Sequence, residues 1–255
     1  MIQIIDVVKR RAYFLLREYL HTGIFGVLTL TALAPTVSSA AIAYVQGTSQ
    51  EPVANLSSLT ATFAAAQVAG DLNVVAVGWT GASSHIVSVI DTKGNVYVAA
   101  GPAGSQSSGG SEAIYYAKNI TAAAAGTNTV TVTYSAVVIY PAILMAEYSG
   151  IDTVSPLDRY VNASGSGTAL SAGPLTTTTA NDLLIGVDLV NQTSVGGPGF
   201  TVRLTGTGGD IFEDKIVSAI GTYSATATES PADWWVMNFI AFKAAGSTGG
   251  GPSCD

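Results

Sequence analysis

The sequence predicts an all-β fold, a jelly-roll-like sandwich of two antiparallel sheets. Residues 128–135 read NTVTVTYS, with apolar side chains on one face and threonines on the other, which is the period of a half-buried strand. The 28 glycines and many Ser and Thr residues separate short apolar runs, as turns separate strands. No segment carries an apolar stripe of helical period between helix caps, so we expect almost no helix.

The individual strands can be predicted in chain order. Ala61 to Ala69 is rich in alanine but lies among Thr and Gly, and it predicts a strand followed by a turn. Asp71 to Trp79 is apolar on both faces apart from one asparagine, which is typical of a central strand. His85 to Val98 predicts a hairpin with residues 91–95 as its turn. Each half of the chain ends on a long apolar strand, Pro141–Tyr148 and Trp234–Lys243.

The chain also resembles itself, over pseudo-repeats at about 60–150 and 171–244. AGDLNVV at 69–75 is similar to ANDLLIG at 180–186, and further similar segments follow in the same order. An internal duplication would give this order, and so would strands of like composition. Because half of the chain cannot bury an apolar sheet face alone, we expect a single sandwich over 41–245. Its two halves should share one core about 10 Å thick.

Residues 1–40 have the three parts of a cleavable signal peptide. A basic region at 9–17 precedes an apolar run at 24–34, and VSSA leads to a cleavage site after Ala40, with Ala43 as the alternative. A membrane anchor is the other interpretation, but the run is about half of the roughly 20 residues that a spanning helix needs. We therefore expect a secreted or cell-surface protein with no transmembrane span in the mature chain.

Charge and composition exclude several function classes. Residues 1–40 hold four of the 10 basic and two of the 17 acidic side chains, so the mature chain keeps six and 15, a net charge of −9. Such a chain repels phosphate backbones, which excludes nucleic acid as a partner. His85 is the one histidine of the mature chain and Cys254 the one cysteine, too few for a zinc or iron site. Cys254 lies in the flexible Gly-rich tail 246–255, as an intermolecular crosslink or an unpaired thiol.

Several stretches of the mature chain carry a resemblance to other sequences. They are IYYAKNI at 114–120, EYSGID at 147–152 with SPLD at 155–158, and ANDLL at 180–184. Together they resemble a recurrent, poorly characterised secreted β-sandwich domain of environmental bacteria, found in hypothetical surface proteins. The resemblance covers nearly the whole mature chain. It implies the fold and the extracytoplasmic location, and it assigns no activity or site.

Carboxylates offer the main catalytic alternative. Glycoside hydrolysis needs two carboxyl groups about 5–10 Å apart across a cleft. Glu147, Glu213 and Asp214 are the candidates, although the E-x-D-x-x-E strand signature of sandwich glucanases is absent. Solvated strand edges and turn caps explain the same residues without catalysis. The sequence therefore favours a protein that is not an enzyme, and it requires no cofactor.

Two further groups of residues are candidates for binding. Calcium takes six to eight oxygen ligands, and acids of the turns could supply some of them. The candidates are Asp91, Asn95, Asp152 and Asp158. Sugars stack on exposed indoles, which makes Trp234, Trp235 and Trp79 candidate ligand contacts. Consecutive strand residues point to opposite faces, so we expect one of Trp234 and Trp235 in the core and the other exposed.

Three function classes remain. The favoured hypothesis is a secreted, non-catalytic cell-surface or matrix module that binds glycan or another extracellular partner. One alternative is a secreted glycoside hydrolase that uses paired carboxylates. The other is a structural surface protein that assembles with itself through the edges of its sheets.

Overall fold

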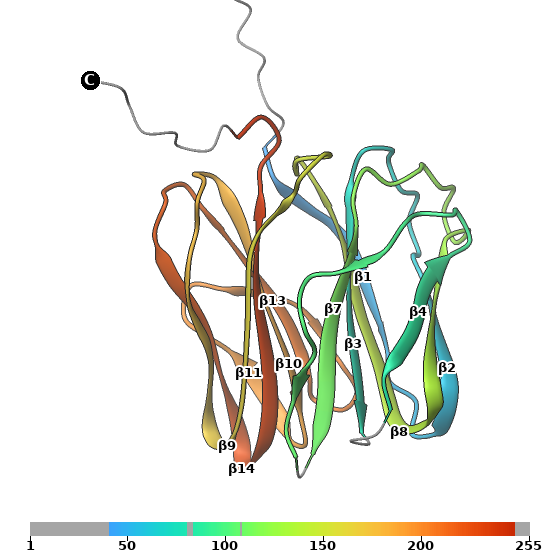
Figure 1. The fold of residues 1–255 in the computed structure, drawn as a ribbon, viewed down its shortest axis with the longest axis vertical. Coiled ribbons are helices and arrows are strands. Elements are labelled where there is room, and N and C mark those ends of the chain that lie inside the picture. Colours follow the sequence, from blue (N-terminus) through green and yellow to red (C-terminus); the bar gives the residue numbers. More distant parts are fainter. Residues whose placement is uncertain (1–40, 81–83, 108, 248–255) are drawn as a thin grey trace, which may run out of the picture. The chain divides into compact units, whose positions relative to one another are not determined.

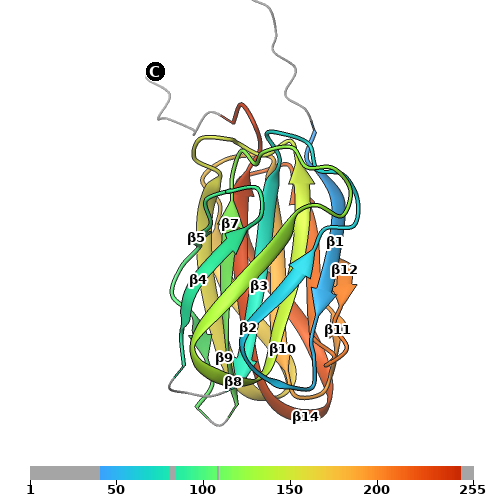
Figure 2. The ribbon, with the colours of Figure 1, turned by 90° about the vertical axis from the view of Figure 1, so that its right-hand side faces the viewer.

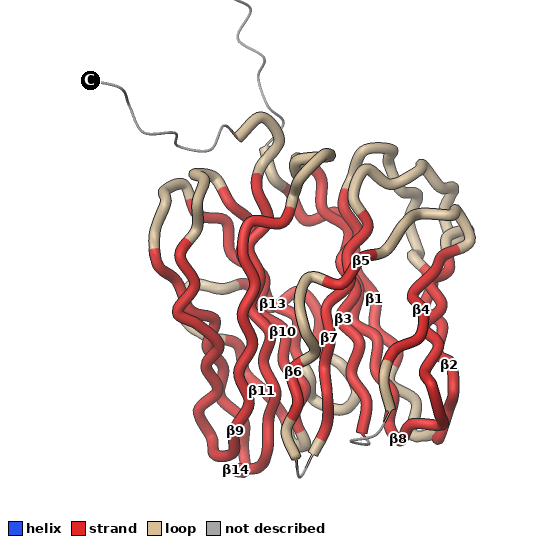
Figure 3. Tube along the Cα trace, in the orientation of Figure 1, coloured by secondary structure: helices blue, strands red, loops and turns tan. Residues whose placement is uncertain are grey.

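The structure, a computed structural model, describes residues 41–80, 84–107 and 109–247. The predicted signal peptide and Cys254 lie outside the described residues. The described part of the chain contains strands and no helix, and so no helix that could cross a membrane. Its two antiparallel sheets, of eight and six strands, pack against each other (Figure 3). The predicted fold class, an all-β two-sheet sandwich, is therefore confirmed.

The first half of the described chain forms the eight-stranded sheet. Its main path runs β1-β8-β3-β7-β5, with β2 and β4 paired to β8 and β6 paired to β7. The strands are β1 (Ala43–Gln50), β2 (Asn55–Thr62), β3 (Leu72–Thr80), β4 (Ile86–Asp91), β5 (Val98–Ala99), β6 (Gly104–Ser105), β7 (Gly110–Ala117) and β8 (Thr129–Ser149).

The second half forms the six-stranded sheet in a corresponding order. β9 pairs with β14, and from there the path runs through β10 and β13 to β12, while β11 also pairs with β14. The strands are β9 (Leu157–Thr176), β10 (Asp182–Val190), β11 (Thr193–Gly196), β12 (Thr201–Thr205), β13 (Ile211–Val217) and β14 (Thr222–Lys243). The sequence β9-β14-β10-β13-β12 thus parallels β1-β8-β3-β7-β5. A duplication predicts such a shared order, and it stays a prediction.

Each sheet folds back over its own outer face, so the sandwich has four layers of strands. The first part of β8 pairs with β2 and β4, and its second part pairs with β1 and β3. β8 turns from one layer to the other near Tyr140, which has a positive φ of 49°. β14 does the same around 229–232, where its register with β9 shifts. Figure 1 shows the four layers side by side, and Figure 2 shows β2, β4 and β8 in front of β3.

Three apolar cores fill the spaces between these layers, which corrects the expectation of one shared core. The central core joins the two halves, and each half adds an outer core of its own. β3 explains the arrangement, because Leu72 and Val74 face the central core while Val75 and Val77 face the first outer core. In the second half, Leu184 faces the second outer core. A strand that is apolar on both faces, as predicted for 71–79, needs a packed layer on each side.

The predicted hairpin at His85–Val98 is wrong. β4 pairs with β8 in the outer layer, whereas β5 pairs with β7 in the inner layer. The connection between them crosses from one layer to the other and is organised by Asp91. Its Oδ1 accepts hydrogen bonds from the N–H groups of Lys93 and Asn95, both at 3.0 Å. The turn itself was predicted correctly, but its strands have different partners.

Candidate functional site

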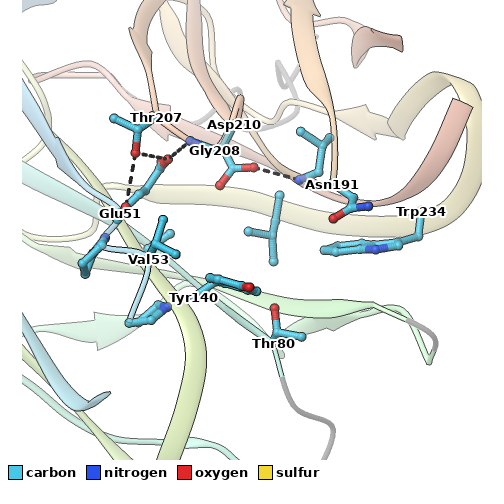
Figure 4. A pocket seen from close by; sticks show the side chains of 14 residues that line it. Glu51, Val53, Thr80, Tyr140, Asn191, Thr207, Gly208, Asp210 and Trp234 are labelled. Carbon is cyan, nitrogen blue, oxygen red and sulfur yellow. Dashed lines mark hydrogen bonds between the residues drawn. The ribbon is translucent and has the colours of Figure 1, made fainter. Parts of the chain in front are cut away.

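A cavity of about 280 Å³ lies at the seam between the two halves. The first half lines it with the loop after β1, the end of β3 and the bend of β8. The second half lines it with the end of β10, the β12–β13 loop and β14. Figure 4 shows Glu51, Val53 and Tyr140 on one side of this space and Asp210 and Trp234 on the other. Neither half could form the cavity alone.

Two carboxyl groups border the cavity. Asp210 is only 4% exposed, and its Oδ1 accepts a hydrogen bond of 2.8 Å from the N–H of Val190. Glu51 reaches across from the first half, where its Oε2 accepts a hydrogen bond of 2.5 Å from the N–H of Gly208. Its Oε1 is buried and has no hydrogen-bond partner among the described residues. Glu51 therefore links the halves and retains an unused acceptor.

Burial raises the pKa of both carboxyl groups. Removal from water is the largest cause that raises the pKa of Asp210 well above its ordinary value, and the charge of Glu51 adds to it. Burial also raises the pKa of Glu51, against the lowering effect of the Gly208 N–H. No Lys or Arg is among the described residues that line the cavity. The described wall of the cavity thus contains two acidic side chains, Glu51 and Asp210, and no Lys or Arg.

Trp234 borders the opposite end of the cavity from Glu51 (Figure 4). Its indole is half-buried and rests on the backbone of Gly109, where an added Cβ would lie 2.1 Å from the ring atom Cδ2. Its backbone N–H donates to Asp233 Oδ1 at 2.8 Å, and Asp233 Oδ2 accepts from the Asn191 amide at 2.7 Å. The backbone of Gly109 therefore supports one face of the indole, and hydrogen bonds through Asp233 fix the Trp234 backbone.

Tyr140 is the second aromatic residue of the cavity. It is 57% exposed and adopts the left-handed backbone conformation, which is costly for a bulky residue. The bend of β8 between two layers imposes this conformation. As a result, an aromatic ring stands at the mouth of the cavity instead of in a core.

We predict that Gly109→Ala displaces the Trp234 ring. The new methyl group would occupy the position of the indole, and the backbone under it is fixed by a hydrogen bond of 3.0 Å from the Gly109 N–H to the Gln106 carbonyl. Tryptophan fluorescence should shift to the red as the ring moves into solvent, with little change in the circular dichroism of the strands. Val195→Ala, at a site that is 63% exposed, controls for the effect of a substitution outside the cavity. An unchanged spectrum for Gly109→Ala would contradict this packing.

The three tryptophans predicted as ligand contacts occupy three different environments. Trp79 is 3% exposed in the first outer core, and its indole N–H donates to the Ser84 carbonyl at 3.1 Å. Trp235 is 8% exposed and belongs to the second outer core. Trp234 alone of the three lines the cavity. As expected, one of the neighbouring pair, Trp235, lies in a core, but Trp234 is half-buried instead of exposed, and Trp79 is also a core residue.

The predicted catalytic carboxylates do not come together. Glu147 lies on the face of β8 that packs against the first outer core, and its Oε2 accepts a hydrogen bond from the Gln46 amide at 2.6 Å. Asp214 lies on the central face of β13 and accepts 2.7 Å and 2.8 Å hydrogen bonds from the Tyr148 hydroxyl and Arg203. Glu213 lies on the opposite face of β13 and accepts from the Gly197 N–H at 3.0 Å. The three groups therefore face three different cores, and none of them lines the cavity at the seam.

The candidate calcium ligands are also dispersed and occupied by hydrogen-bond donors. Asp91 Oδ2 accepts from the Asn95 amide at 2.7 Å, in addition to the two backbone donors at Oδ1. Asp152 accepts from two N–H groups of its own turn, at 2.7 and 2.9 Å. Asp158 accepts from the Thr178 N–H at 2.7 Å. Among the residues that the structure describes, no three acidic, His or Cys side chains are grouped as a metal site.

Sequence reasoning missed Glu51 as a site residue. Nothing local marks it, because it follows a strand in an ordinary Glu-Pro turn and meets Gly208 only through the packing of the two halves. No family model, curated protein or solved structure matches the chain. Functional inference therefore depends on the geometry of the cavity.

Proposed function

We propose that the protein is a secreted, non-catalytic cell-surface or matrix module that binds a glycan in the cavity at the seam. The observation that carries the proposal is the combination of a held indole, Trp234, with hydrogen-bonding carboxyl groups in one cavity. Sugar rings present both an apolar C–H face, which packs on an aromatic ring, and hydroxyl groups, which bond to carboxylates. Export is supported by the basic, apolar and small-residue parts of residues 1–40.

The size of the cavity limits what it can hold. Its volume of about 280 Å³ is near the lower end of small-molecule sites, which begin at about 300 Å³. A single sugar ring or the end of a glycan chain suits this space better than a long internal segment. The exposed Tyr140 at the mouth could then contact the next ring.

The proposal predicts a selective loss of binding in Trp234→Ala. Removing the indole should weaken binding by about 1–3 kcal/mol, roughly 5- to 150-fold, because the aromatic face is lost. Trp234→Phe should keep most of the affinity, since a ring still covers the sugar. A glycan array followed by calorimetry on the best ligand measures this, with melting temperatures to establish that each variant is folded. Equal binding by the wild type and Trp234→Ala would sink the proposal.

A secreted glycoside hydrolase is the second candidate, and one observation favours it. Glu51 and Asp210 share the cavity, and a carboxyl group with a raised pKa is suited to act as a general acid. Turnover of a glycan that Asp210→Asn abolishes would establish catalysis. Binding without turnover supports the module.

A further inference from the structure

The acidity of the cavity at the seam continues into the protein behind it. Asp188 is fully buried, and its oxygens accept from the Ile211 N–H at 2.8 Å and the Ser194 hydroxyl at 2.5 Å. Glu112 is 2% exposed and accepts from the Asn238 amide at 2.5 Å. All of these donors are neutral groups. Together with Glu51 and Asp210 they form a group of four carboxyl groups, hereafter the acidic cluster.

No basic side chain balances the acidic cluster among the described residues. The one ion pair found there joins Arg203 to Asp214 at 2.8 Å. Arg203 lies on β12, at the edge of the six-stranded sheet, and Asp214 lies on β13. Burial is the largest cause that raises the pKa of Asp210, and the charges of Glu51, Asp188 and Glu112 add to it. A positive charge placed in the cavity would favour the ionised form of Asp210, which burial and the neighbouring carboxyl groups disfavour.

Asp210 connects the acidic cluster to the space where a ligand would lie. The residue is nine-tenths buried, and its side-chain Oδ1 accepts a hydrogen bond from the Val190 N–H. Its Oδ2 has no hydrogen bond to a described residue. Figure 4 shows the Asp210 carboxyl group over the space bordered by Tyr140 and Trp234. A ligand ammonium group in that space would meet an Asp210 oxygen, whose ionised form it would stabilise, and an aromatic face, and these are the two kinds of group that recognise ammonium.

We infer that the cavity at the seam selects a glycan that carries a protonated amine, that is, an amino sugar without an N-acyl group. This inference rests on the proposed function, because it names the class of glycan that the same site takes. A bare metal ion fits less well, since calcium needs six to eight oxygen ligands and the cavity wall supplies two carboxyl groups. A neutral sugar would bring no positive charge to stabilise the ionised form of Asp210.

Calorimetry with matched oligosaccharides tests the inference on the full mature chain. Oligomers of glucosamine, of N-acetylglucosamine and of glucose differ in the substituent at one position of each ring, and only the glucosamine oligomer carries a positive charge there. The glucosamine oligomer should bind at least 10-fold more tightly than the other two, and its affinity should fall as salt is added. Asp210→Asn should abolish that preference while keeping the hydrogen bond to Val190. Glu51→Gln should reduce it, and Asp152→Asn, which removes a charge at the opposite end of the strands, should not.

The outcomes separate the two proposals. If the acetylated and neutral oligomers bind as tightly as glucosamine, the inference is overturned and glycan binding stands. The same holds if Asp210→Asn and Glu51→Gln, both folded, keep the full preference. If no oligosaccharide of any class binds, glycan binding itself fails.

Discussion

The melting temperature of the mature protein is expected to fall by about 10 °C or more when the pH rises from 5 to 8. Burial raises the pKa of several carboxyl groups to about 6 or 7, so the folded chain holds protons that the unfolded chain has released. These groups are Asp71, Asp182, Asp188 and Glu213. Their contribution to stability is fully present below their unfolded pKa near 4, and it is lost as the pH rises towards 7.

Asp188 sets the scale of this effect. Its pKa of about 7 against an ordinary 3.8 corresponds to as much as about 4 kcal/mol. For a chain of this size, 1 kcal/mol shifts the melting temperature by about 2–4 °C. Scanning calorimetry across the pH range measures the slope.

Two variants identify the groups responsible for the pH dependence. Asp188→Asn keeps a carbonyl oxygen for the Ile211 N–H and an amide for the Ser194 hydroxyl, so it should flatten the slope and be more stable than the wild type at pH 8. Asp152→Asn removes a group whose pKa is lowered by hydrogen bonds from the Ser155 and Val154 N–H groups, and it should not flatten the slope. A melting temperature that rises between pH 5 and 8 would falsify the account of buried, protonated carboxyl groups.

Phe242→Ala is expected to destabilise the folded chain by about 3–5 kcal/mol, because it leaves a cavity in the central core. Phe242 is fully buried in the central core, with its ring centroid 5.3 Å from that of Tyr116 in the other half. Urea denaturation measures the loss. Val195→Ala, at a site that is 63% exposed, should change the free energy of unfolding by less than about 0.5 kcal/mol.

The same variant tests whether the central core joins the two halves energetically. Phe242 lies on β14, yet its loss should also weaken hydrogen-exchange protection in β3 of the first half. Loss of protection confined to the second sheet would mean that the halves are stabilised separately.

Much of the fold could be predicted because it depends on patterns within single strands. The alternation at 128–135 places Val130 and Val132 in a core, as predicted. The two-sided apolar pattern at 71–79 identified a central strand correctly. The folding of each sheet over itself could not be predicted, because it depends on which partners the two parts of β8 and β14 find. The alternation of apolar residues within a strand predicts which of its faces are buried. The layers depend on which strands pair with each other, and this alternation does not predict the pairing.

The site was less accessible to prediction for the same reason. Trp234 was identified, since neighbouring tryptophans in a strand must diverge. Glu51 has no signature of its own and becomes a neighbour of Asp210 only when the two halves pack. Glu213 and Asp214 are neighbours in the sequence but do not share a site, because adjacent strand residues face opposite ways.

The direction of the strands also determines how the protein would present its cavity. Ala43 pairs with Ser149, and Ala244 bridges Ile151, so both ends of the described chain leave the sandwich at the Leu72 end of β3. Thr80, at the other end of β3, lines the cavity. The rise along this nine-residue strand separates the two by about 26 Å. A protein anchored through either end would hold the cavity at the seam on the side away from the anchor.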